Sequence, residues 1–272
     1  MSLHEYKYRK YQDKYLTLKT TNKMDKAIQQ IKNQEAISHE FVNIALTETE
    51  QTIIDNIKIT NNGQFNYFGV AKNPKLLKLI KEFISSIDNS NQSTSITKIM
   101  WYRIIKPYLD ALQSNTLDHE AIWLTIRVTP NANSLFDVPR WHIDGTYYKS
   151  IDNYNIKLAG VLKGPATIFK SDNAEMRQIF IPLLLEHSRN KQNFNKETDV
   201  ESRMSINEKI KNYETRHPTT NQVAIFAVGD TKKAAIHSEP KIDRERLFFS
   251  IVAGNKTHIK ELAERFNSTF ID

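Results

Sequence analysis

Short strand-like segments in the second half of the chain constrain the fold most. After about residue 120, apolar and β-branched residues recur in brief runs that end at polar or Gly-Pro breaks, which is typical of strands. The runs are AIWLTIRV (121–128), VPRWHID (138–144), IKLAGVLK (156–163), ATIF (166–169), QVAIFAV (222–228), AAIH (234–237) and RLFFSIVAG (246–254). The sixth run is expected to return beside the fifth after the turn GDTKK. So many short strands predict a sandwich or a barrel.

The residues before about 115 predict mainly helices. Asn73-Pro74 is a good helix start and precedes KLLKLIKEFISSI. In residues 24–46, Ile28, Ile31 and Phe41 recur at roughly helical spacing, which predicts a helix that includes Phe41. We therefore expect one α+β domain over 1–272, with a helical part (1–115), a strand-rich core (120–255) and a C-terminal helix (256–272).

A polar stretch of about residues 172–221 interrupts the strand-rich core. It is too long for a simple loop and contains the helical pattern AEMRQIFIPLLLEHS, so we expect a helical insert between core strands. An insert at this place serves as a lid, as a substrate-recognition element or only as a packing element.

The composition excludes several classes of protein. The chain of 272 residues has no cysteine, which excludes disulfides, thiolate nucleophiles and cysteine-based zinc sites. No apolar run approaches the roughly 20 residues that a membrane helix needs. The start MSLHEYKYRKYQDKY lacks the apolar region of a secretory signal. We expect a cytoplasmic protein without a membrane partner.

The net charge of +7 is concentrated near the N-terminus. Residues 1–32 contain eight Lys or Arg and three Asp or Glu, and also Tyr6, Tyr8, Tyr11 and Tyr15. Basic residues interleaved with tyrosines indicate a segment that contacts nucleic acid or another anionic partner. The alternative is a solvated helix whose Tyr8, Tyr11 and Tyr15 pack on the domain at helical spacing.

RWHIDGTYY (140–148) indicates a metal site. Residues two apart on a strand face the same way, so His142 and Asp144 present an imidazole and a carboxylate on one side. His237, at another strand end, is the best third ligand. Two histidines and one carboxylate form the facial triad of non-haem Fe(II) oxygenases, and the His-Glu-x-x-His helix of zinc hydrolases is absent. Aromatic residues that either line the pocket or belong to the core flank the motif: Trp141, Tyr147 and Tyr148.

Two residues of the last strand indicate a carboxylate clamp. Arg246 and Ser250 share one face of the strand, and an Arg fork beside a hydroxyl suits a carboxylate. Arg244 has the same facing but lies in a polar loop, which makes it the weaker candidate. Arg127 either reaches the cosubstrate or substrate, or forms a structural ion pair.

The pattern His-x-Asp, His and Arg-x-x-x-Ser resembles the 2-oxoglutarate/Fe(II)-dependent dioxygenase superfamily. The resemblance covers about residues 120–255, including the Gly229-Asp230 turn before His237. It implies a double-stranded β-helix (jelly roll) with outer N-terminal helices. It also implies that Fe(II) is bound by His142, Asp144 and His237, and that Arg246 and Ser250 bind 2-oxoglutarate. The implied reaction is the hydroxylation of an unidentified substrate with release of succinate and CO2.

Two other functions stay open. One is a non-catalytic jelly-roll binding protein whose basic N-terminal segment contacts nucleic acid or another anionic partner. The other is a cupin-type metal enzyme that does not need Arg246 and does not use 2-oxoglutarate.

Overall fold

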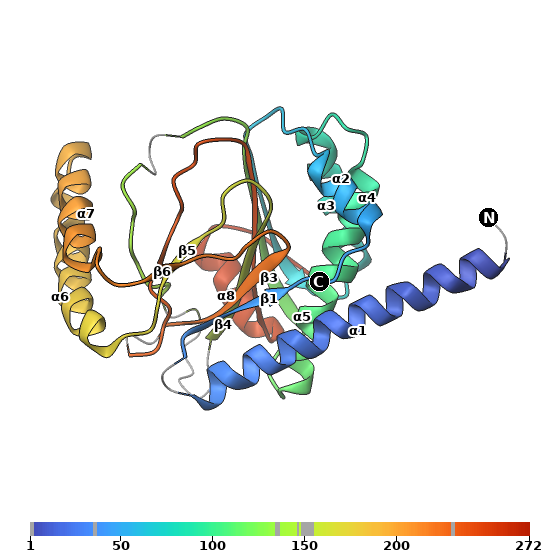
Figure 1. Cartoon of the computed structure of the whole chain (residues 1–272), viewed down its shortest axis with the longest axis horizontal. Helices are drawn as coiled ribbons and strands as arrows, with labels where there is room; N and C mark the ends of the chain where they lie inside the picture. The colour runs from blue at the N-terminus through green and yellow to red at the C-terminus, as the bar shows by residue number, and fades with distance from the viewer. Residues whose placement is uncertain (1–2, 35–36, 134–136, 146, 148–154, 230–231) are drawn as a thin grey trace.

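The fold is seen in a computed structural model of the chain, which describes residues 3–34, 37–133, 137–145, 147, 155–229 and 232–272 (Figure 1). Its centre is a seven-stranded sheet in the order β1-β7-β4-β9-β3-β2-β10. All neighbouring strands are antiparallel except the parallel pair β10 and β2. The strands are β1 (His39–Asn43), β2 (Gly63–Val70), β3 (Ala121–Thr129), β4 (Asn155–Lys163), β7 (Gln222–Val228), β9 (Arg246–Gly254) and β10 (Phe270–Ile271).

A smaller sheet faces the large one. Its order is β6 (Thr215–Arg216), β5 (Ile168–Lys170) and β8 (His237–Ser238). Phe169 of β5 packs against Phe226 of β7 at 5.3 Å between ring centroids, so the two sheets share an apolar interior.

The large sheet separates a helical layer from the space between the sheets. In β9, Leu247 and Phe249 belong to the core shared with the helices. The alternate residues Arg246, Phe248 and Ser250 line a cavity on the other face. The helices of the layer are α1 (Leu3–Asn33), α2 (Glu48–Asp55), α3 (Pro74–Ile87), α4 (Ser93–Ile99), the π-helix η1 (Met100–Ile105) and α5 (Lys106–Ser114). The helix α8 (Lys256–Arg265) packs over β2 and β3.

The polar stretch is helical, as the sequence predicts, and its helices form a hairpin. It consists of α6 (Ala174–Asn190), the 3-10 turn η3 (Lys191–Asn193) and α7 (Lys196–Ile210). Figure 1 shows this hairpin on the side of the molecule away from α2, α3 and α4. It packs on the outer face of the small sheet, because Trp141, Ile168 and Ile236 join its apolar residues in one cluster.

Three sequence predictions about elements are wrong. The helix predicted through Phe41 ends at Asn33, and Phe41 lies in β1, which pairs along the edge of β7. The segment 138–144 forms only a bridge at His142, because Pro139 lacks an N–H and the N–H of Arg140 bonds to the Ser238 side chain. The segment 234–237 does not return along β7 as a ladder, because the chain crosses into the small sheet.

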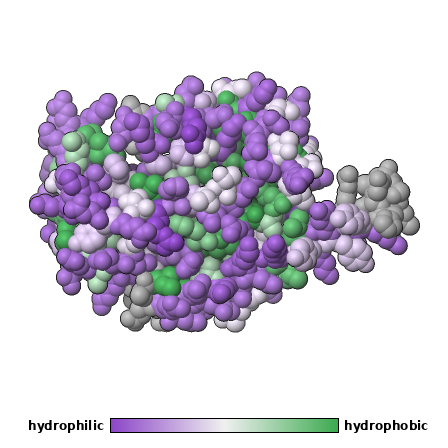
Figure 2. Space-filling model, in the orientation of Figure 1, coloured by the Kyte–Doolittle hydropathy of each residue, from purple (hydrophilic) through white to green (hydrophobic). Residues whose placement is uncertain are grey.

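The N-terminal half of α1 extends away from the body of the molecule (Figures 1 and 2). Tyr8, Tyr11 and Tyr15 are 64%, 73% and 63% exposed, so the idea that they pack on the domain is wrong. The side chain of Tyr6 lies outside the described residues. Among the helices of the described part of the chain, none is both long and apolar enough to cross a membrane.

Candidate active site

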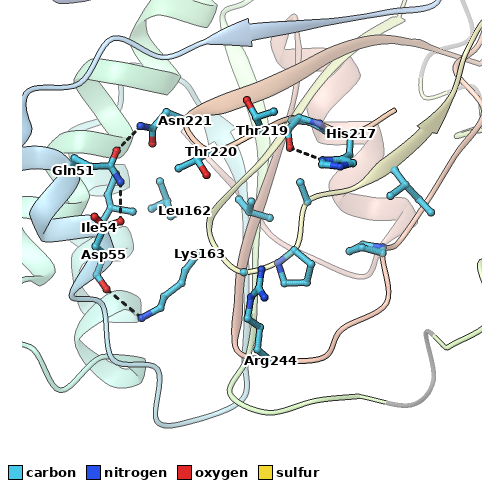
Figure 3. Close-up of a pocket in the computed structure, with 17 residues that line it drawn as sticks. Gln51, Ile54, Asp55, Leu162, Lys163, His217, Thr219, Thr220, Asn221 and Arg244 are labelled. Atoms are coloured by element: carbon cyan, nitrogen blue, oxygen red, sulfur yellow. Dashed lines mark hydrogen bonds between the residues drawn. The ribbon is translucent and has the colours of Figure 1, made fainter. Parts of the chain in front are cut away.

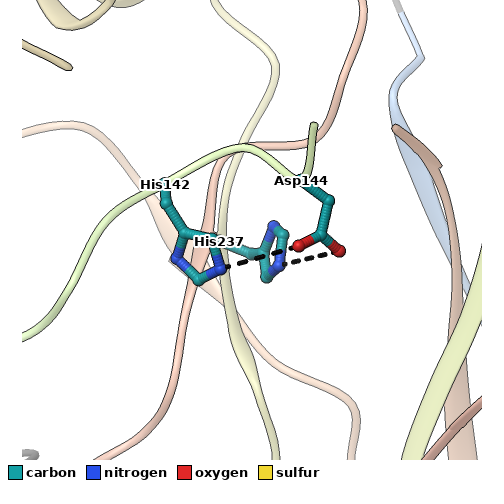
Figure 4. A group of neighbouring side chains, drawn as sticks. All are labelled: His142, Asp144 and His237. Carbon is teal, nitrogen blue, oxygen red and sulfur yellow. Dashed lines mark ion pairs between the residues drawn. The ribbon is translucent and has the colours of Figure 1, made fainter. Parts of the chain in front are cut away.

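Backbone pairing brings the two histidines of the predicted triad together. The N–H of His142 donates to the carbonyl of His237 at 2.9 Å, and the N–H of His237 donates back to His142 at 2.9 Å. The two rings then lie side by side, with centroids 4.3 Å apart. Asp144 is two residues further on and points to the same side (Figure 4). One ligand atom from each of the three residues lies within 4.8 Å of the others, which suits a metal ion.

Hydrogen bonds set the tautomer of both imidazoles. Nδ1 of His142 lies 2.7 Å from the carbonyl oxygen of Arg140, and Nδ1 of His237 lies 3.0 Å from that of Ala235. A carbonyl oxygen only accepts, so each Nδ1 carries the proton and each Nε2 keeps a lone pair. These Nε2 atoms face Asp144, at 3.9 Å from Oδ1 for His142 and 3.7 Å from Oδ2 for His237. The lone pairs are therefore directed to the centre of the triad.

A buried lysine completes the electrostatics of the triad. Nζ of Lys157 in β4 lies 2.8 Å from Oδ2 of Asp144 and donates to the Tyr147 hydroxyl at 3.3 Å. Burial alone would raise the pKa of Asp144, but Lys157, with help from the two histidines, outweighs it and holds that pKa well below its usual range. Burial, assisted by His142, lowers the pKa of His237 to about 4. At neutral pH the site therefore offers a carboxylate and a neutral His237, the forms that bind a metal.

The segment that carries His142 and Asp144 is held in place by its neighbours. The N–H of Gly229 donates to the carbonyl of Asp144 at 2.9 Å, and Gly229 adopts φ +89°, a conformation that favours glycine. The other residue of the predicted Gly-Asp turn, Asp230, lies outside the described residues, as does Tyr148.

A cavity of about 300 Å³ contains the triad and reaches Arg246. Arg246 is only 6% exposed, and its Nε donates to the carbonyl of Pro165 at 2.9 Å. Its guanidinium lies 4.6 Å from the ring centroid of Phe248. Burial lowers the pKa of Arg246 to about 10, against the opposing effect of Glu239. Nη2 is buried and has no hydrogen-bond partner among the described residues. A buried cationic donor without a partner indicates a place for an anion.

The other predicted clamp residues are distributed over two cavities. Ser250 and Arg127 line the triad cavity, and Phe248 lies between Ser250 and Arg246 along β9. Arg244 instead lines a separate cavity of about 620 Å³, which contains none of the triad residues (Figure 3). The geometry therefore favours Arg246 over Arg244.

Gly164 allows Arg246 to approach the turn after β4. It has φ +86°, and a Cβ at this position would lie 2.2 Å from the carbonyl oxygen of Glu245 and 2.8 Å from Cα of Arg246. Only glycine fits such a close approach of two backbones.

Three charged residues of the cavity were missed by sequence reasoning: Arg140, Lys157 and Glu239. Lys157 binds Asp144, and Glu239 pairs with Arg140. The signal for Lys157 was a lone charge within the apolar run IKLAGVLK. Trp141 packs against the helical hairpin and lines a second cavity there, and Tyr147 lines the triad cavity.

Comparison with known proteins gives structural similarity only. No family model matches the chain, and no curated protein matches its sequence. Among solved structures, the chain is similar to the rice dioxygenase for auxin oxidation (8% identity, 91% of this chain and 92% of that chain, TM-score 0.46). It is also similar to the Kdo hydroxylase KdoO, a non-heme Fe(II) alphaketoglutarate-dependent dioxygenase, solved with alphaketoglutarate and Fe(III) (12% identity, 93% of this chain and 92% of that chain, TM-score 0.42). A third similar structure is a prolyl-4-hydroxylase from Pseudomonas putida (10% identity, 85% of this chain and 98% of that chain, TM-score 0.41). KdoO is an enzyme of the class that the sequence motif resembles.

Proposed function

We propose that the protein is a 2-oxoglutarate- and Fe(II)-dependent oxygenase that hydroxylates a substrate. One observation carries this proposal: a His-Asp-His group with both Nε2 lone pairs directed inward shares a cavity with the buried Nη2 of Arg246, which has no hydrogen-bond partner among the described residues. The donor set fits Fe(II), and the unpartnered guanidinium nitrogen fits one carboxylate of 2-oxoglutarate. A cupin-type enzyme without this cosubstrate would leave the buried cation unexplained.

The proposal includes a double-stranded β-helix as the core. Consecutive strands alternate between the sheets: β4 lies in the large sheet, β5 and β6 in the small one, β7 in the large, β8 in the small and β9 in the large. A chain that passes between two facing sheets in this way supports a jelly roll. One domain over residues 1–272 is part of the same proposal, since the N-terminal helices and the large sheet share one core.

Each residue of the site has a role in this reaction. His142, Asp144 and His237 would hold Fe(II), and Lys157 would keep Asp144 ionised and occupy its Oδ2, which leaves Oδ1 for the metal. Arg246 would bind the distal carboxylate of 2-oxoglutarate. Two further residues of the cavity would assist it, Ser250 as a hydrogen-bond donor and Arg127 as a second cation. An aromatic wall would limit the access of water and consists of Trp123, Tyr147 and Phe266.

Bound Fe(II) would supply oxygen activation, coupled to the decarboxylation of 2-oxoglutarate to succinate and CO2. The protein itself contributes the orientation of the ligands and the shielding of the cavity.

The test is the formation of succinate from 2-oxoglutarate in air with added Fe(II), followed by NMR. We expect slow formation without substrate in the wild type and none above background in His142→Ala or His237→Ala. Wild-type rates in either variant would refute the site assignment.

A further inference from the structure

We infer that the substrate binds between the metal-ligand segment 140–144 and the helical hairpin, and that it is an organic anion with an apolar body. This inference rests on the oxygenase function proposed above and names the class of its substrate. The starting point is a second cavity, of about 450 Å³, at the same triad.

The metal-ligand segment borders two cavities. Arg140, His142 and Asp144 line both the cavity that contains Arg246 and the second cavity. The second cavity does not contain Arg246, and residues of α6, η3 and α7 form its opposite wall. A molecule in it would therefore lie beside the metal ligands without displacing the cosubstrate.

The hairpin wall is fixed against the metal-ligand segment. Trp141 and Ile143 alternate with the two ligands and turn outward into the apolar cluster of the hairpin, where Phe180 and Ile206 are buried. Nε1 of Trp141 donates to Oδ1 of Asn207 at 2.9 Å. The hairpin is thus packed firmly against the metal-ligand segment. The cavity between them is largely preformed, as small-molecule sites are.

Part of the cavity lining is apolar. The lining contains aliphatic side chains of the hairpin and of the metal-ligand segment: Ile143, Ile181, Leu184, Leu185 and Ile206. Leu185 is 45% exposed although it is a large apolar residue. An apolar lining beside the metal-ligand segment suits the hydrocarbon body of a substrate.

The charged side chains of the lining are mostly cations. Arg140, Lys191 and Arg203 line the cavity, against one carboxylate, Asp144, which belongs to the triad. Arg140 is paired with Glu239, and Arg203 lies 3.1 Å from Asp199. For Lys191, the described part of the chain contains no carboxylate within ion-pair distance.

The cation of the lining that an anion can pair with is Lys191. His187 also lines the cavity, with its Nδ1 2.8 Å from the Ser202 hydroxyl and its Nε2 3.7 Å from Oδ1 of Asp199. Lys191 therefore provides a cation that an acidic head group can pair with, while the apolar wall takes the rest of the molecule. A carboxylate and a phosphate share this chemistry. A volume of about 450 Å³ lies in the range of sites for small molecules.

The test uses the full chain loaded with Mn(II) and 2-oxoglutarate, titrated by calorimetry with four probes of equal chain length: octanoate, octyl phosphate, octanol and octylamine. We expect at least one of the two anions to bind about tenfold more tightly than octanol, and octylamine not to bind. The stronger of octanoate and octyl phosphate identifies the head group.

Variants separate the charge from the apolar wall. Lys191→Glu should weaken anion binding about tenfold and leave octanol unchanged, and Lys209→Glu on the exposed face of α7 is the matched control. Leu185→Asn, which adds polarity without charge, should weaken octanoate and octanol alike, and because Leu185 is 45% exposed we expect the variant to fold. Equal binding of all four probes, no binding of any probe, or unchanged anion affinity in Lys191→Glu would overturn the inference.

The same titration keeps the two claims apart. If Mn(II) and 2-oxoglutarate bind but no probe does, the substrate class is wrong and the oxygenase function stands. If neither metal nor 2-oxoglutarate binds, the oxygenase function fails, and with it the inference that rests on it.

Discussion

Replacing Arg246 by methionine removes the cation that we assign to 2-oxoglutarate while keeping an unbranched side chain over Phe248. A hydrogen bond to a charged partner contributes about 1.5–3 kcal/mol. The loss of the guanidinium fork should therefore cost about 3 kcal/mol of binding free energy, or about 100-fold in the Kd for 2-oxoglutarate. The assay is calorimetric titration of 2-oxoglutarate into Mn(II)-loaded protein, with Mn(II) affinity measured separately and expected to stay unchanged.

The stability of the metal-free protein should change little in this variant. Arg246→Met loses the bond from Nε to the carbonyl of Pro165, but it also removes a buried Nη2 that has no partner in the described structure. The two effects oppose each other, each about 1–3 kcal/mol, so the free energy of unfolding should shift by less than about 2 kcal/mol.

Arg244→Met is the matched control, because Arg244 lines a different cavity (Figure 3). It should bind 2-oxoglutarate as the wild type does. A folded Arg246→Met protein with wild-type affinity for 2-oxoglutarate, or a loss of affinity confined to Arg244→Met, would refute the reasoning.

Three further predictions concern the surroundings of the site. Lys157→Met should lower the free energy of unfolding by about 3 kcal/mol in urea denaturation, because it leaves the buried Asp144 carboxylate without its cation at 2.8 Å, and adding Asp144→Asn should recover part of the loss. Gly164→Ala should cost about 1–3 kcal/mol of stability and weaken 2-oxoglutarate binding several-fold, since its Cβ would push on the backbone of Arg246. Burial lowers the pKa of His39 to about 4, so between about pH 6.5 and 4 the unfolded chain takes up the proton first. The contribution of His39 is therefore fully present above pH 6.5 and is lost as the pH falls, by about 2 kcal/mol between pH 7 and pH 5, and His39→Gln should reduce this slope; an unchanged slope would contradict the assignment.

Part of the geometry of the candidate site could be predicted from the sequence because it depends on local geometry. The facing of His142 and Asp144 follows from the alternation of an extended chain, and Arg246 and Ser250 follow from the same rule on β9. Neither depends on which segments pair. The structure then places His142, Asp144, His237 and Arg246 along one cavity.

The other features of the candidate site depend on which distant segments pair, and the spacing of residues along the chain does not predict this pairing. The backbone bridge between His142 and His237 joins residues far apart in sequence and sets the distance between the rings. The role of Lys157 as the partner of Asp144 could not be predicted, because it depends on β4 lying beside Asp144. Phe41 lies at helical spacing from earlier apolar residues, yet it forms a strand because its segment pairs with the edge of β7.

The arrangement of the elements was partly predictable for the same reason. The helix that begins at Asn73-Pro74 has the predicted cap, with the Asn73 side chain accepting from the N–H of Lys75. The insert was predicted as helical. That it packs on Trp141 could not be predicted, because the contact depends on which side of the metal-ligand segment faces the hairpin in three dimensions.

The most direct test of the central claim is the anaerobic addition of Fe(II) and then 2-oxoglutarate to the purified chain, followed by visible absorption. Asp144→Ala and Arg246→Met serve as comparisons, since the first removes a metal ligand and the second the cosubstrate clamp. We predict a metal-to-cosubstrate charge-transfer band in the wild type that is absent in Asp144→Ala and needs far more 2-oxoglutarate in Arg246→Met. A wild-type protein that retains no Fe(II) and gives no band would contradict the account.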